Sequence, residues 1–456
     1  MGIGGEWDVI VCGAGMAGLC AGVSATEAGA RTLVIEKGSR AGGSMRMSGG
    51  TVWTAPNMAV MERFVPGGDR VRQEQLVHNL APGLEWLAVH GVPLGGVIGG
   101  EFQIGREVNV DTLTERMVEV IQANGGDVAV SAALERLDLD ETGRIRGLTV
   151  READGRRSTI DTRAVVLATG GFQGNHELLA RWVGRYADQL LQRANPNSVG
   201  EGLIAAMAIG ARTSPNLSTF YGHTMPASPA SPEPAQWTSV TTYFSQDAIL
   251  VNERGERFFD ESRSMADELA PGEIVQQPNA RAFLLLDDRL YTDQPMPGRS
   301  RAAVRPNFDN AVAAGAPNAT ATTLEGLADA LAAWGVSRRG FLATITGFNK
   351  AVGEDRGAEL RIPRTGSPFG LIQPPYRALA VRPAITFTLG GIDVDPDLRV
   401  LDHSGRPIPG LWAAGADAGG TFQGGYMGGL VLGLVQGRIA GRAAAEATGS
   451  AVTTGD

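Results

Sequence analysis

Short apolar runs alternate with a small-residue helical pattern at the start of the chain. Residues 7–12 (WDVIVC) and 31–36 (RTLVIE) are apolar enough for buried strands, and residues 16–29 between them have the spacing of a helix. A strand, a helix and a strand within about 30 residues predict a β-α-β unit, and such units build parallel sheets. A further apolar run at residues 163–169 (RAVVLAT) predicts another strand of the same kind.

The rest of the chain falls into segments with other patterns. Helical spacing dominates residues 74–124, whereas residues 127–161 predict a small β-meander. Residues 248–260 predict a hairpin that turns at Arg254 and Gly255. Further helices are expected at residues 200–211, 324–334, 338–353 and 427–446, and further strands at residues 398–401 and 411–414. The strand-and-helix character of the first part therefore returns near the C-terminal end.

Two proline-rich segments separate these regions, one at residues 225–237 and one at residues 363–375. We therefore expect an α/β fold in which one Rossmann-type domain is built from residues 1–240 and 371–456. Residues 241–370 are expected to form an α+β cap inserted into that domain. At roughly 100–200 residues per domain, a chain of 456 residues accommodates this organisation.

Glycine is the one residue type whose share is unusual enough to indicate a function. The chain has 63 glycines in 456 residues, about twice the usual share of roughly 7%. They gather at residues 13–18, 42–50, 170–174, 390–391 and 415–429. Glycine clusters in a folded enzyme indicate turns where the backbone must approach a ligand closely.

Charge and cysteine content exclude several classes of protein. The net charge is −9 and no run of five or more basic residues occurs, so we expect no nucleic-acid surface. No apolar stretch of about 18 residues predicts a membrane span, and the N-terminus lacks the pattern of a signal peptide. Cys12 and Cys20 lack a metal-ligand spacing, and we expect two small buried thiols in a protein of the reducing cytoplasm.

The clearest motif is a glycine turn between the first strand and the first helix. Gly13, Gly15 and Gly18 follow the spacing G-x-G-x-x-G. Gly13 permits the tight turn, Gly15 lets the backbone approach a pyrophosphate, and Gly18 lets the helix pack on the strand. Glu36 ends the second strand, where its carboxylate can accept a hydrogen bond from a ribose hydroxyl. Together these residues predict a dinucleotide site, the alternative being a glycine-rich turn that binds nothing.

Three further stretches favour FAD over NAD. They are residues 42–50, residues 168–172 (ATGGF) and residues 408–420 (IPGLWAAGADAGG), the last followed by a small-residue helix. With these stretches, the sequence resembles the large flavoprotein family that includes fumarate reductase, succinate dehydrogenase and the 3-ketosteroid dehydrogenases, from Asp8 to about Ala445. The resemblance implies that the first glycine cluster and the acidic residue bind the ADP half of FAD. It also implies that the late glycine-rich motif and the last helix approach the flavin ring.

The resemblance implies cofactor contacts at four places in the chain. The residues concerned are Gly13, Gly15, Met16, Ala17, Gly18, Glu36 and Lys37; Gly43, Ser44, Ser48, Gly49 and Gly50; Ala168, Thr169 and Gly170; and Gly415, Asp417, Gly429 and Leu430. Asp417 or its neighbours would approach the ribityl chain, although the family places its acidic or amide residue one position earlier, where this chain has Ala416. The membrane-complex members attach FAD through a histidine just before the second glycine cluster. Residues 43–48 (GSMRMS) contain no histidine, so we expect non-covalent FAD.

The chain departs from the fumarate reductases at the positions that bind dicarboxylates there. Phe387 stands where those enzymes have a histidine, and Tyr426 stands where they have an arginine. Arg263, in the stretch RFFDESR, lies near the position of their cap arginine but out of step with it. It is a candidate substrate ligand, and the alternative is an ion-paired loop. These departures argue against a dicarboxylate substrate.

Tyr426, before a glycine turn, is similar to the corresponding tyrosine of the 3-ketosteroid dehydrogenases and the tricarballylate dehydrogenase-like group. Residues 48–53 (SGGTVW) are also similar to that branch. The resemblance implies that Tyr426 and a nearby backbone N–H hold a substrate carbonyl, as a small oxyanion hole. Tyr221, Tyr243 and His223 are candidates for the base. The ordinary alternatives are a helix-capping role for Tyr426 and a solvated loop position for His223.

We therefore expect an FAD-dependent oxidoreductase that dehydrogenates a CH–CH bond next to a carbonyl, with its active site between the FAD domain and the cap. Hydride would pass to flavin N5 and a proton to a tyrosine or histidine base, with a cyclic ketone or related small carbonyl compound as substrate. One alternative is a fumarate reductase-like reductase of enoates or enones that uses external electrons. Another is a non-catalytic flavoprotein partner. The electron acceptor and the oligomeric state stay open, and no metal site stands out.

Overall fold

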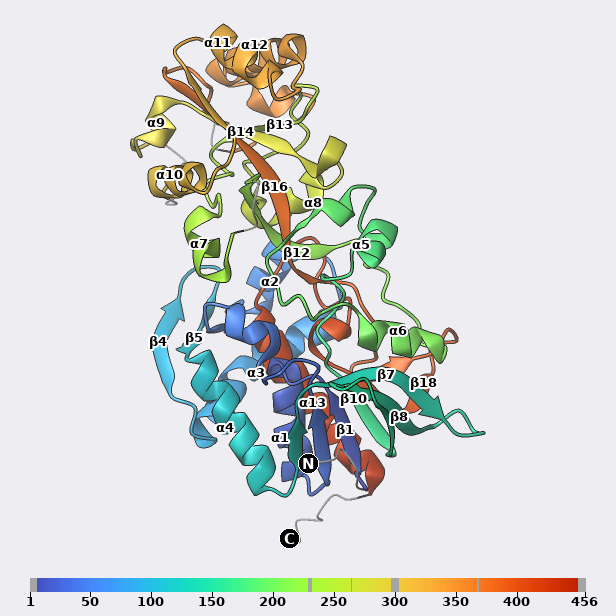
Figure 1. Cartoon of the computed structure of the whole chain (residues 1–456). Helices are drawn as coiled ribbons and strands as arrows, with labels where there is room; N and C mark the ends of the chain where they lie inside the picture. Colours follow the sequence, from blue (N-terminus) through green and yellow to red (C-terminus); the bar gives the residue numbers. More distant parts are fainter. Residues whose placement is uncertain (1–5, 229–231, 264, 297–302, 367–368, 450–456) are drawn as a thin grey trace. The chain divides into compact units, whose positions relative to one another are not determined.

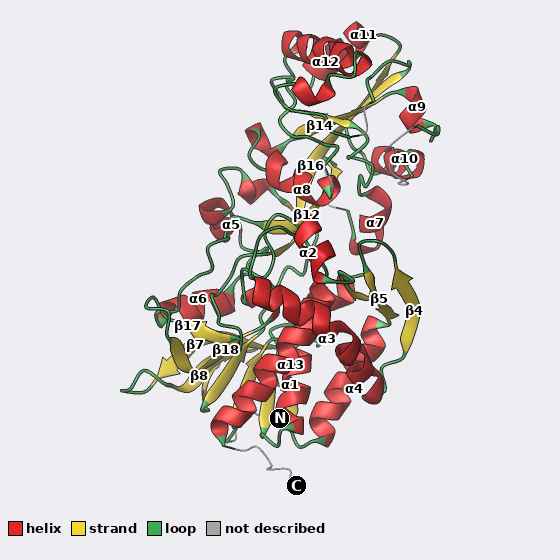
Figure 2. Ribbon diagram, turned by 180° about the vertical axis from the view of Figure 1, so that it is seen from behind, coloured by secondary structure: helices red, strands yellow, loops and turns green. Residues whose placement is uncertain are grey.

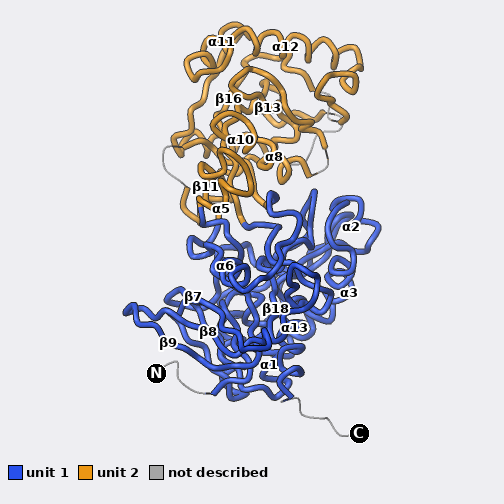
Figure 3. The backbone as a smooth tube through the Cα atoms, turned by 90° about the vertical axis from the view of Figure 1, so that its right-hand side faces the viewer, with its two compact units in different colours: residues 1–175, 194–219, 387–456 blue, residues 176–193, 220–386 orange. Residues whose placement is uncertain are grey.

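The computed structural model of the chain describes residues 6–228, 232–263, 265–296, 303–366 and 369–449. The chain forms two compact units (Figure 3). Unit 1 comprises residues 1–175, 194–219 and 387–456, and unit 2 comprises residues 176–193 and 220–386. Unit 2 thus takes in residues 176–193, 220–240 and 371–386, which the sequence-based division assigned to the Rossmann-type domain.

A six-stranded sheet lies at the centre of unit 1 (Figure 1). Its strands follow the order β17 (Arg399–Leu401), β18 (Pro407–Ala413), β10 (Ala164–Leu167), β1 (Val9–Cys12), β2 (Thr32–Ile35) and β6 (Asp127–Ala129). Each neighbouring pair is parallel except β17 with β18. All residues of β1, β2 and β10 are buried, as expected for parallel strands covered on both faces. The predicted parallel sheet is confirmed, and both ends of the chain contribute to it.

Two helices from opposite ends of the chain lie side by side on this sheet (Figure 2). α1 (Met16–Glu27) follows β1, and α13 (Gly429–Thr448) is the last helix. A Cβ atom added to Gly437 would lie 2.2 Å from the carbonyl oxygen of Ala17, and one added to Gly441 would lie 2.1 Å from that of Ala21. These glycines therefore let the two backbones touch. Around this pair, α4 (Val110–Ala123) packs on α1 and α3 (Arg70–Val89) packs on α13.

Part of the region predicted to be helical is a small antiparallel sheet. β4 (Leu94–Gly99) and β5 (Ile104–Val108) form a hairpin, and β5 also pairs with β3 (Thr51–Thr54). The prediction of mainly helix at residues 74–124 is therefore wrong for this hairpin, although it holds for α3 and α4. Residues 94–100 (LGGVIGG) carry four glycines and lack the alternation of apolar and polar residues that signals a strand.

The remaining elements of unit 1 follow the predicted pattern, except the helix at Met58–Phe64, which was not predicted. β7 (Ala132–Leu139), β8 (Ile145–Glu152) and β9 (Arg157–Asp161) form the expected meander. The other helices are α2 (Met58–Phe64) and α6 (Glu201–Ala208). Cys12 and Cys20 are free and buried, as predicted. Within the described residues, no helix combines the length and the apolar composition needed to cross a membrane.

Unit 2 is built on a mixed sheet around β16 (Tyr376–Thr388). Its other strands are β11 (Leu191–Gln192), β12 (Phe220–Pro226), β13 (Ile249–Val251), β14 (Ala282–Leu286) and β15 (Asn318–Ala321). The predicted turn at Gly255 is present, but the expected hairpin is reduced to a single bridge, and the strand partner of β13 is β14. Val251 and Arg257 form an isolated bridge across that turn.

Helices cover both faces of this second sheet. Leu284 of β14 belongs to an apolar core that includes residues of α8 and α10, whereas its neighbour Phe283 belongs to a core with residues of α11 and α12. Because successive side chains of a strand point to opposite faces, the two cores lie on opposite sides of the sheet. The helices of unit 2 are α5 (His176–Trp182), α7 (Trp237–Val240), α8 (Ala266–Ile274), α9 (Asp288–Tyr291), α10 (Arg305–Ala313), α11 (Leu324–Ala332) and α12 (Arg338–Gly353).

Candidate active site

The three glycines of the β1–α1 turn meet different surroundings. Gly13 has φ +106°, and a Cβ atom there would lie 2.2 Å from the carbonyl oxygen of Ala168. A Cβ atom on Gly18 would lie 1.7 Å from the carbonyl oxygen of Gly13. A Cβ atom on Gly15 would have no described neighbour within 4 Å. Gly13 and Gly18 are thus required by the protein itself, whereas Gly15 borders open space at the N-terminus of α1, where a diphosphate binds in such turns.

Glu36 forms hydrogen bonds to the backbone beside this turn. Its carboxylate accepts a hydrogen bond of 2.9 Å from the Ala14 N–H and one of 2.7 Å from the Gly38 N–H. The side chain is buried, and each oxygen takes one of these bonds. A carboxylate has about four acceptor positions in all, so lone pairs remain for ribose hydroxyls. Lys37, which was also expected at the cofactor, instead directs its ammonium to Glu201 and to the carbonyl oxygen of Asn197.

The second glycine cluster lies against the first. Residues Gly43–Met47 form a short 3-10 helix, and Gly43 has φ +50°. A Cβ atom on Gly43 would lie 3.2 Å from the Cα atom of Gly15, so the two glycine turns meet beside the open space at Gly15. Ser44 lies within this helix, and the Ser48 hydroxyl donates to the Met45 carbonyl at 2.7 Å. The Gly50 N–H donates to the Ser48 hydroxyl oxygen at 3.2 Å.

Asp417 connects the glycine-rich stretch at residues 408–420 to the stretch at residues 168–172 by hydrogen bonds. Its carboxylate accepts hydrogen bonds from the Thr169 backbone N–H, from the Thr169 hydroxyl at 2.8 Å and from the Gly171 N–H at 3.1 Å. The side chain is fully buried, and this burial raises the pKa of its carboxyl. The geometry thus gives Asp417 a firm role in holding the turn after β10, while its expected approach to the ribityl chain stays a prediction.

Two buried polar atoms near this turn lack a hydrogen-bond partner among the described residues. They are Gln173 Oε1 and Thr388 Oγ1. A Cβ atom on Gly171 would lie 2.9 Å from the first and 2.5 Å from the second, so both gather at one point of unit 1. Buried polar atoms are rarely left unpaired in folded proteins. The glycine turns border open space, and unpaired polar atoms lie at the turn after β10. Both features fit a bound dinucleotide such as FAD.

Tyr426 lies among aromatic rings at the start of α13. Its ring centroid is 5.7 Å from those of Trp53 and Phe387 and 5.9 Å from that of Phe422, in edge-to-face arrangements. Phe102 continues this group, with its centroid 6.1 Å from that of Trp53. We call these five residues the aromatic group. Phe422 and Phe102 were not predicted from the sequence, because Phe102 lies on the unexpected hairpin.

The Tyr426 oxygen accepts a hydrogen bond of 2.6 Å from the backbone N–H of Gly429. The expected oxyanion hole had the phenol O–H and a nearby backbone N–H side by side. In the structure the Gly429 N–H acts on the phenol oxygen instead. A donor at that oxygen draws electron density from it, which makes the phenol a stronger hydrogen-bond donor.

The three base candidates come together in unit 2. The Tyr221 hydroxyl lies 2.9 Å from Nε2 of His223, and the His223 ring lies edge-to-face with that of Tyr243 at 5.2 Å. His223 is only 4% exposed, so it is not a solvated loop histidine. Burial, with a smaller contribution from the charge of Arg193, lowers the pKa of His223 to about 3. The imidazole is therefore neutral at physiological pH.

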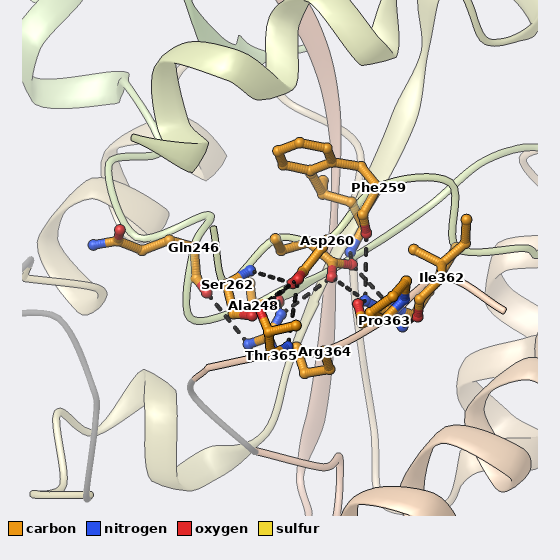
Figure 4. A network of polar contacts seen from close by, with 12 residues as sticks. Gln246, Ala248, Phe259, Asp260, Ser262, Ile362, Pro363, Arg364 and Thr365 are labelled. Carbon is orange, nitrogen blue, oxygen red and sulfur yellow. Dashed lines mark hydrogen bonds and ion pairs between the residues drawn. The ribbon is translucent and has the colours of Figure 1, made fainter. Parts of the chain in front are cut away.

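Arg263, the remaining candidate, also belongs to unit 2. It is exposed, and its guanidinium lies over the Phe259 ring at 5.8 Å. The buried charge of the RFFDESR stretch is Glu261, which pairs with Arg257 and Arg364. Figure 4 shows Arg364 reaching the backbone oxygens of Gln246 and Ala248. The stretch thus contains a buried ion-paired centre at Glu261, and a substrate-binding role for Arg263 stays a prediction.

The family described as FAD binding domain matches residues 8–429. The chain belongs to this family. It is similar to a probable fumarate reductase of Shewanella frigidimarina, with 27% identity over 91% of this chain and 70% of that protein. It is also similar, at 27% identity over 90% of this chain and 87% of that protein, to the 4-oxocyclohexanecarboxylate 2-dehydrogenase of Sinomonas cyclohexanicum. As a member of the FAD binding domain family, it is an FAD-dependent oxidoreductase.

The fold is similar to that of solved flavoenzyme structures. The 3-ketosteroid-Δ4-(5α)-dehydrogenase of Rhodococcus jostii RHA1 superimposes with a TM-score of 0.73, at 24% identity, over 96% of this chain and 97% of that one. The predicted fold class, a Rossmann-type FAD-binding fold with an inserted α+β part, is confirmed. In the described part of the chain, no group of three or more His, Cys, Asp and Glu side chains is arranged to hold a metal ion.

Proposed function

We propose that this protein dehydrogenates the CH–CH bond next to the carbonyl of a cyclic ketone, giving an α,β-unsaturated product. The observation that carries the proposal is Tyr426, whose oxygen accepts the Gly429 N–H at the start of α13 within the aromatic group. A phenol in that setting suits a neutral carbonyl oxygen. FAD, when bound, would accept the hydride that leaves the substrate.

Tyr426 would hold the substrate by donating its hydroxyl hydrogen to the carbonyl oxygen. A donor at that oxygen stabilises the enolate-like charge that develops when the neighbouring C–H loses its proton, because the charge moves onto the oxygen. The Gly429 N–H strengthens this effect by polarising the phenol. One such donor is worth about 100- to 1,000-fold in turnover in comparable sites.

The aromatic group supports an apolar ring as the body of the substrate. Phe387 and Tyr426 stand where the fumarate reductases have a histidine and an arginine, so the cations that bind a dicarboxylate are absent from these two positions. Aromatic side chains offer large apolar surfaces to a ring. The similarity to a 4-oxocyclohexanecarboxylate 2-dehydrogenase supports the same substrate class.

A second candidate function is the reverse chemistry, reduction of an enone or enoate with electrons from an external donor. The observation in its favour is the 27% identity with a probable fumarate reductase. The two functions are separated by mixing the protein anaerobically with each partner. Dehydrogenation predicts that a cyclic ketone bleaches the oxidised flavin absorbance. Reductase function predicts that ketones leave it unchanged, while an enone restores the absorbance of the dithionite-reduced protein rapidly.

The proposal is tested most directly by Tyr426→Phe. We expect turnover of cyclohexanone-type substrates to fall about 100-fold or more, because the donor to the carbonyl is lost, while flavin content is retained. Tyr291→Phe is the matched control, since Tyr291 donates to Asp309 on the surface of unit 2. Full turnover in the Tyr426 variant would remove this residue from the chemistry and the proposal with it.

A further inference from the structure

Arg72, in the first turn of α3, is a buried cation of unit 1. Its side chain is only 3% exposed. Asp69, the N-cap residue of α3, accepts the Arg72 N–H at 2.9 Å, and its other carboxylate oxygen lies 3.5 Å from Arg72 Nη2. The Asp69 side chain is 36% exposed, so water screens its charge while that of Arg72 is shielded from water. Burying a charge is costly, and this one is only partly compensated by its ion-pair partner.

The guanidinium of Arg72 holds the glycine turn at residues 419–420. Its Nη1 donates a hydrogen bond of 2.7 Å to the carbonyl oxygen of Gly419. Gly420 has φ +91°, and a Cβ atom there would lie 3.1 Å from Nη2. The Asp69 backbone N–H donates to the carbonyl oxygen of Gly420 at 2.9 Å. The start of α3 and the glycine turn are therefore joined through both backbone and side chain.

The same turn belongs to the part of unit 1 that fits FAD. The Gly420 N–H donates to the carbonyl oxygen of Leu389 at 2.9 Å, and the residue before it, Thr388, carries one of the two unpaired polar atoms described above. At the other end of the stretch, a Cβ atom on Gly415 would lie 2.9 Å from the Cβ atom of Ala17, in α1. The stretch that Arg72 holds thus extends from the first turn of α1 to the unpaired hydroxyl of Thr388.

Arg72 places a positive charge behind this turn. Burial lowers the pKa of Arg72, and the charges of Asp69, Asp393 and Asp395 raise it, but an arginine stays protonated at neutral pH. Asp393 and Asp395 each pair with another arginine, so Asp69 is the partner that offsets Arg72. The field of a buried charge is screened much less than that of an exposed one. It therefore acts on a cofactor that the turn borders.

We propose that Arg72 is a positioning residue of the FAD site, which fixes the Gly419–Gly420 turn and through its buried positive charge raises the reduction potential of the bound flavin. FAD that accepts a hydride gains one negative charge, and a nearby cation stabilises that form. Charges near the ring are one of the means by which a protein tunes a flavin. The inference goes beyond the proposed dehydrogenation, because it holds for either direction of the reaction and for any substrate.

The inference is tested by the midpoint potential of the flavin, which needs no substrate. Each variant is saturated with FAD and equilibrated anaerobically with a redox dye. In Arg72→Gln we expect the equilibrium to shift about tenfold or more toward oxidised flavin, a potential about 30 mV lower for two electrons. Arg72→Lys keeps the charge and should stay within about threefold of the unaltered protein. Arg116→Gln, at an exposed arginine of α4 paired with Glu119, is the matched control and should change nothing.

A substitution of the opposite sign separates charge from structure. Asparagine is as good an N-cap as aspartate, so Asp69→Asn keeps the start of α3 while it removes the negative charge beside Arg72. We expect the equilibrium to shift about threefold toward reduced flavin, a potential about 15 mV higher. A purely structural role of this pair predicts no such opposition between the two variants.

Three results would overturn the inference. They are an unchanged potential in Arg72→Gln, equal shifts in Arg72→Gln and Arg72→Lys, and shifts of the same direction in Arg72→Gln and Asp69→Asn. If Arg72→Gln does not bind flavin, Asp69→Asn decides, since a potential that fails to rise there contradicts the role of the charge. None of these results bears on ketone turnover by the unaltered protein, so the proposed dehydrogenation stands or falls separately.

Discussion

Gly15 and Gly18 both lack a side chain, but the space that a Cβ atom would occupy is different at the two positions. Gly18 is needed because the carbonyl oxygen of Gly13 occupies the place of a Cβ atom, whereas Gly15 faces open space and has an ordinary extended backbone. Gly18 serves the fold and Gly15 serves the ligand. The sequence motif predicts both requirements, because they follow from spacing within a single turn.

Alanine at the two positions should therefore produce opposite results. Gly18→Ala is expected to lower the free energy of unfolding by about 1–3 kcal/mol or more through overpacking. Gly15→Ala should unfold like the unaltered apoprotein but bind FAD about tenfold more weakly or worse, as measured by flavin titration. Gly347→Ala, at an exposed position of α12 with no neighbour within 4 Å, is the control and should gain about 0.5–1 kcal/mol. Equal flavin affinity in the Gly15 variant would contradict the assignment.

Other features of individual residues could not be predicted from the sequence. The contact of Tyr426 with Trp53 joins residues far apart in the chain, and the approach of Asp267 to His223 joins a helix to a strand. Such contacts depend on tertiary packing, which no local pattern encodes. The burial of His223 belongs here too, because the sequence left a solvated loop position open as an alternative, whereas α8 packs on its strand and the side chain is buried.

At the scale of elements, the β4–β5 hairpin is the main departure from expectation. Its glycines obscure the strand pattern, yet they allow a tight ladder, since a Cβ atom on Gly105 would lie 2.1 Å from the Val52 carbonyl oxygen. The hairpin carries Phe102 to Trp53, and so adds one aromatic ring to the surroundings of Tyr426. Helices with strong period or capping signals, such as α11 and α12, were predicted within a few residues.

This arrangement makes Phe102 a determinant of substrate size. Phe102→Ala should raise KM for a cyclic ketone several-fold with little change in kcat, because an apolar wall is lost while the Tyr426 hydroxyl stays in place. Val97→Ala, on the same hairpin but 77% exposed, should leave both constants unchanged. Steady-state kinetics with rings of increasing size would check this, and a fall in kcat alone would argue against the assignment.

At the scale of the whole molecule, the sequence predicts the fold class better than the division of the chain. The parallel sheet follows from apolar strands at both ends of the chain, which pair as β18, β10 and β1. The limits of the second unit depend on β12 and β16, two strands without a strong apolar alternation. The ion-paired loop around Glu261 was predicted only as an alternative, and the structure shows it buried between two arginines.

That loop offers a test of how far the two units depend on each other. Glu261→Gln leaves Arg257 and Arg364 buried without their counter-charge, which typically costs about 3–5 kcal/mol. The residues argued to hold FAD all lie in unit 1, so flavin affinity measured well below the unfolding temperature should be unchanged. Glu256→Gln, at a half-exposed carboxylate, is the control. Thermal unfolding and flavin titration together report both effects, and an unchanged midpoint would show that the buried pairs contribute little.

The close packing of α1 with α13 has an electrostatic consequence. Gly433 meets Met16 and Gly441 meets Ala21, so the two helices run parallel, with both N-termini at the same edge. Parallel helix dipoles repel one another, and each N-terminus carries about half a positive charge. The apoprotein therefore bears a repulsion that a dianion at this edge relieves. Inorganic diphosphate alone should raise the melting temperature of the apoprotein, and the gain should shrink as ionic strength rises.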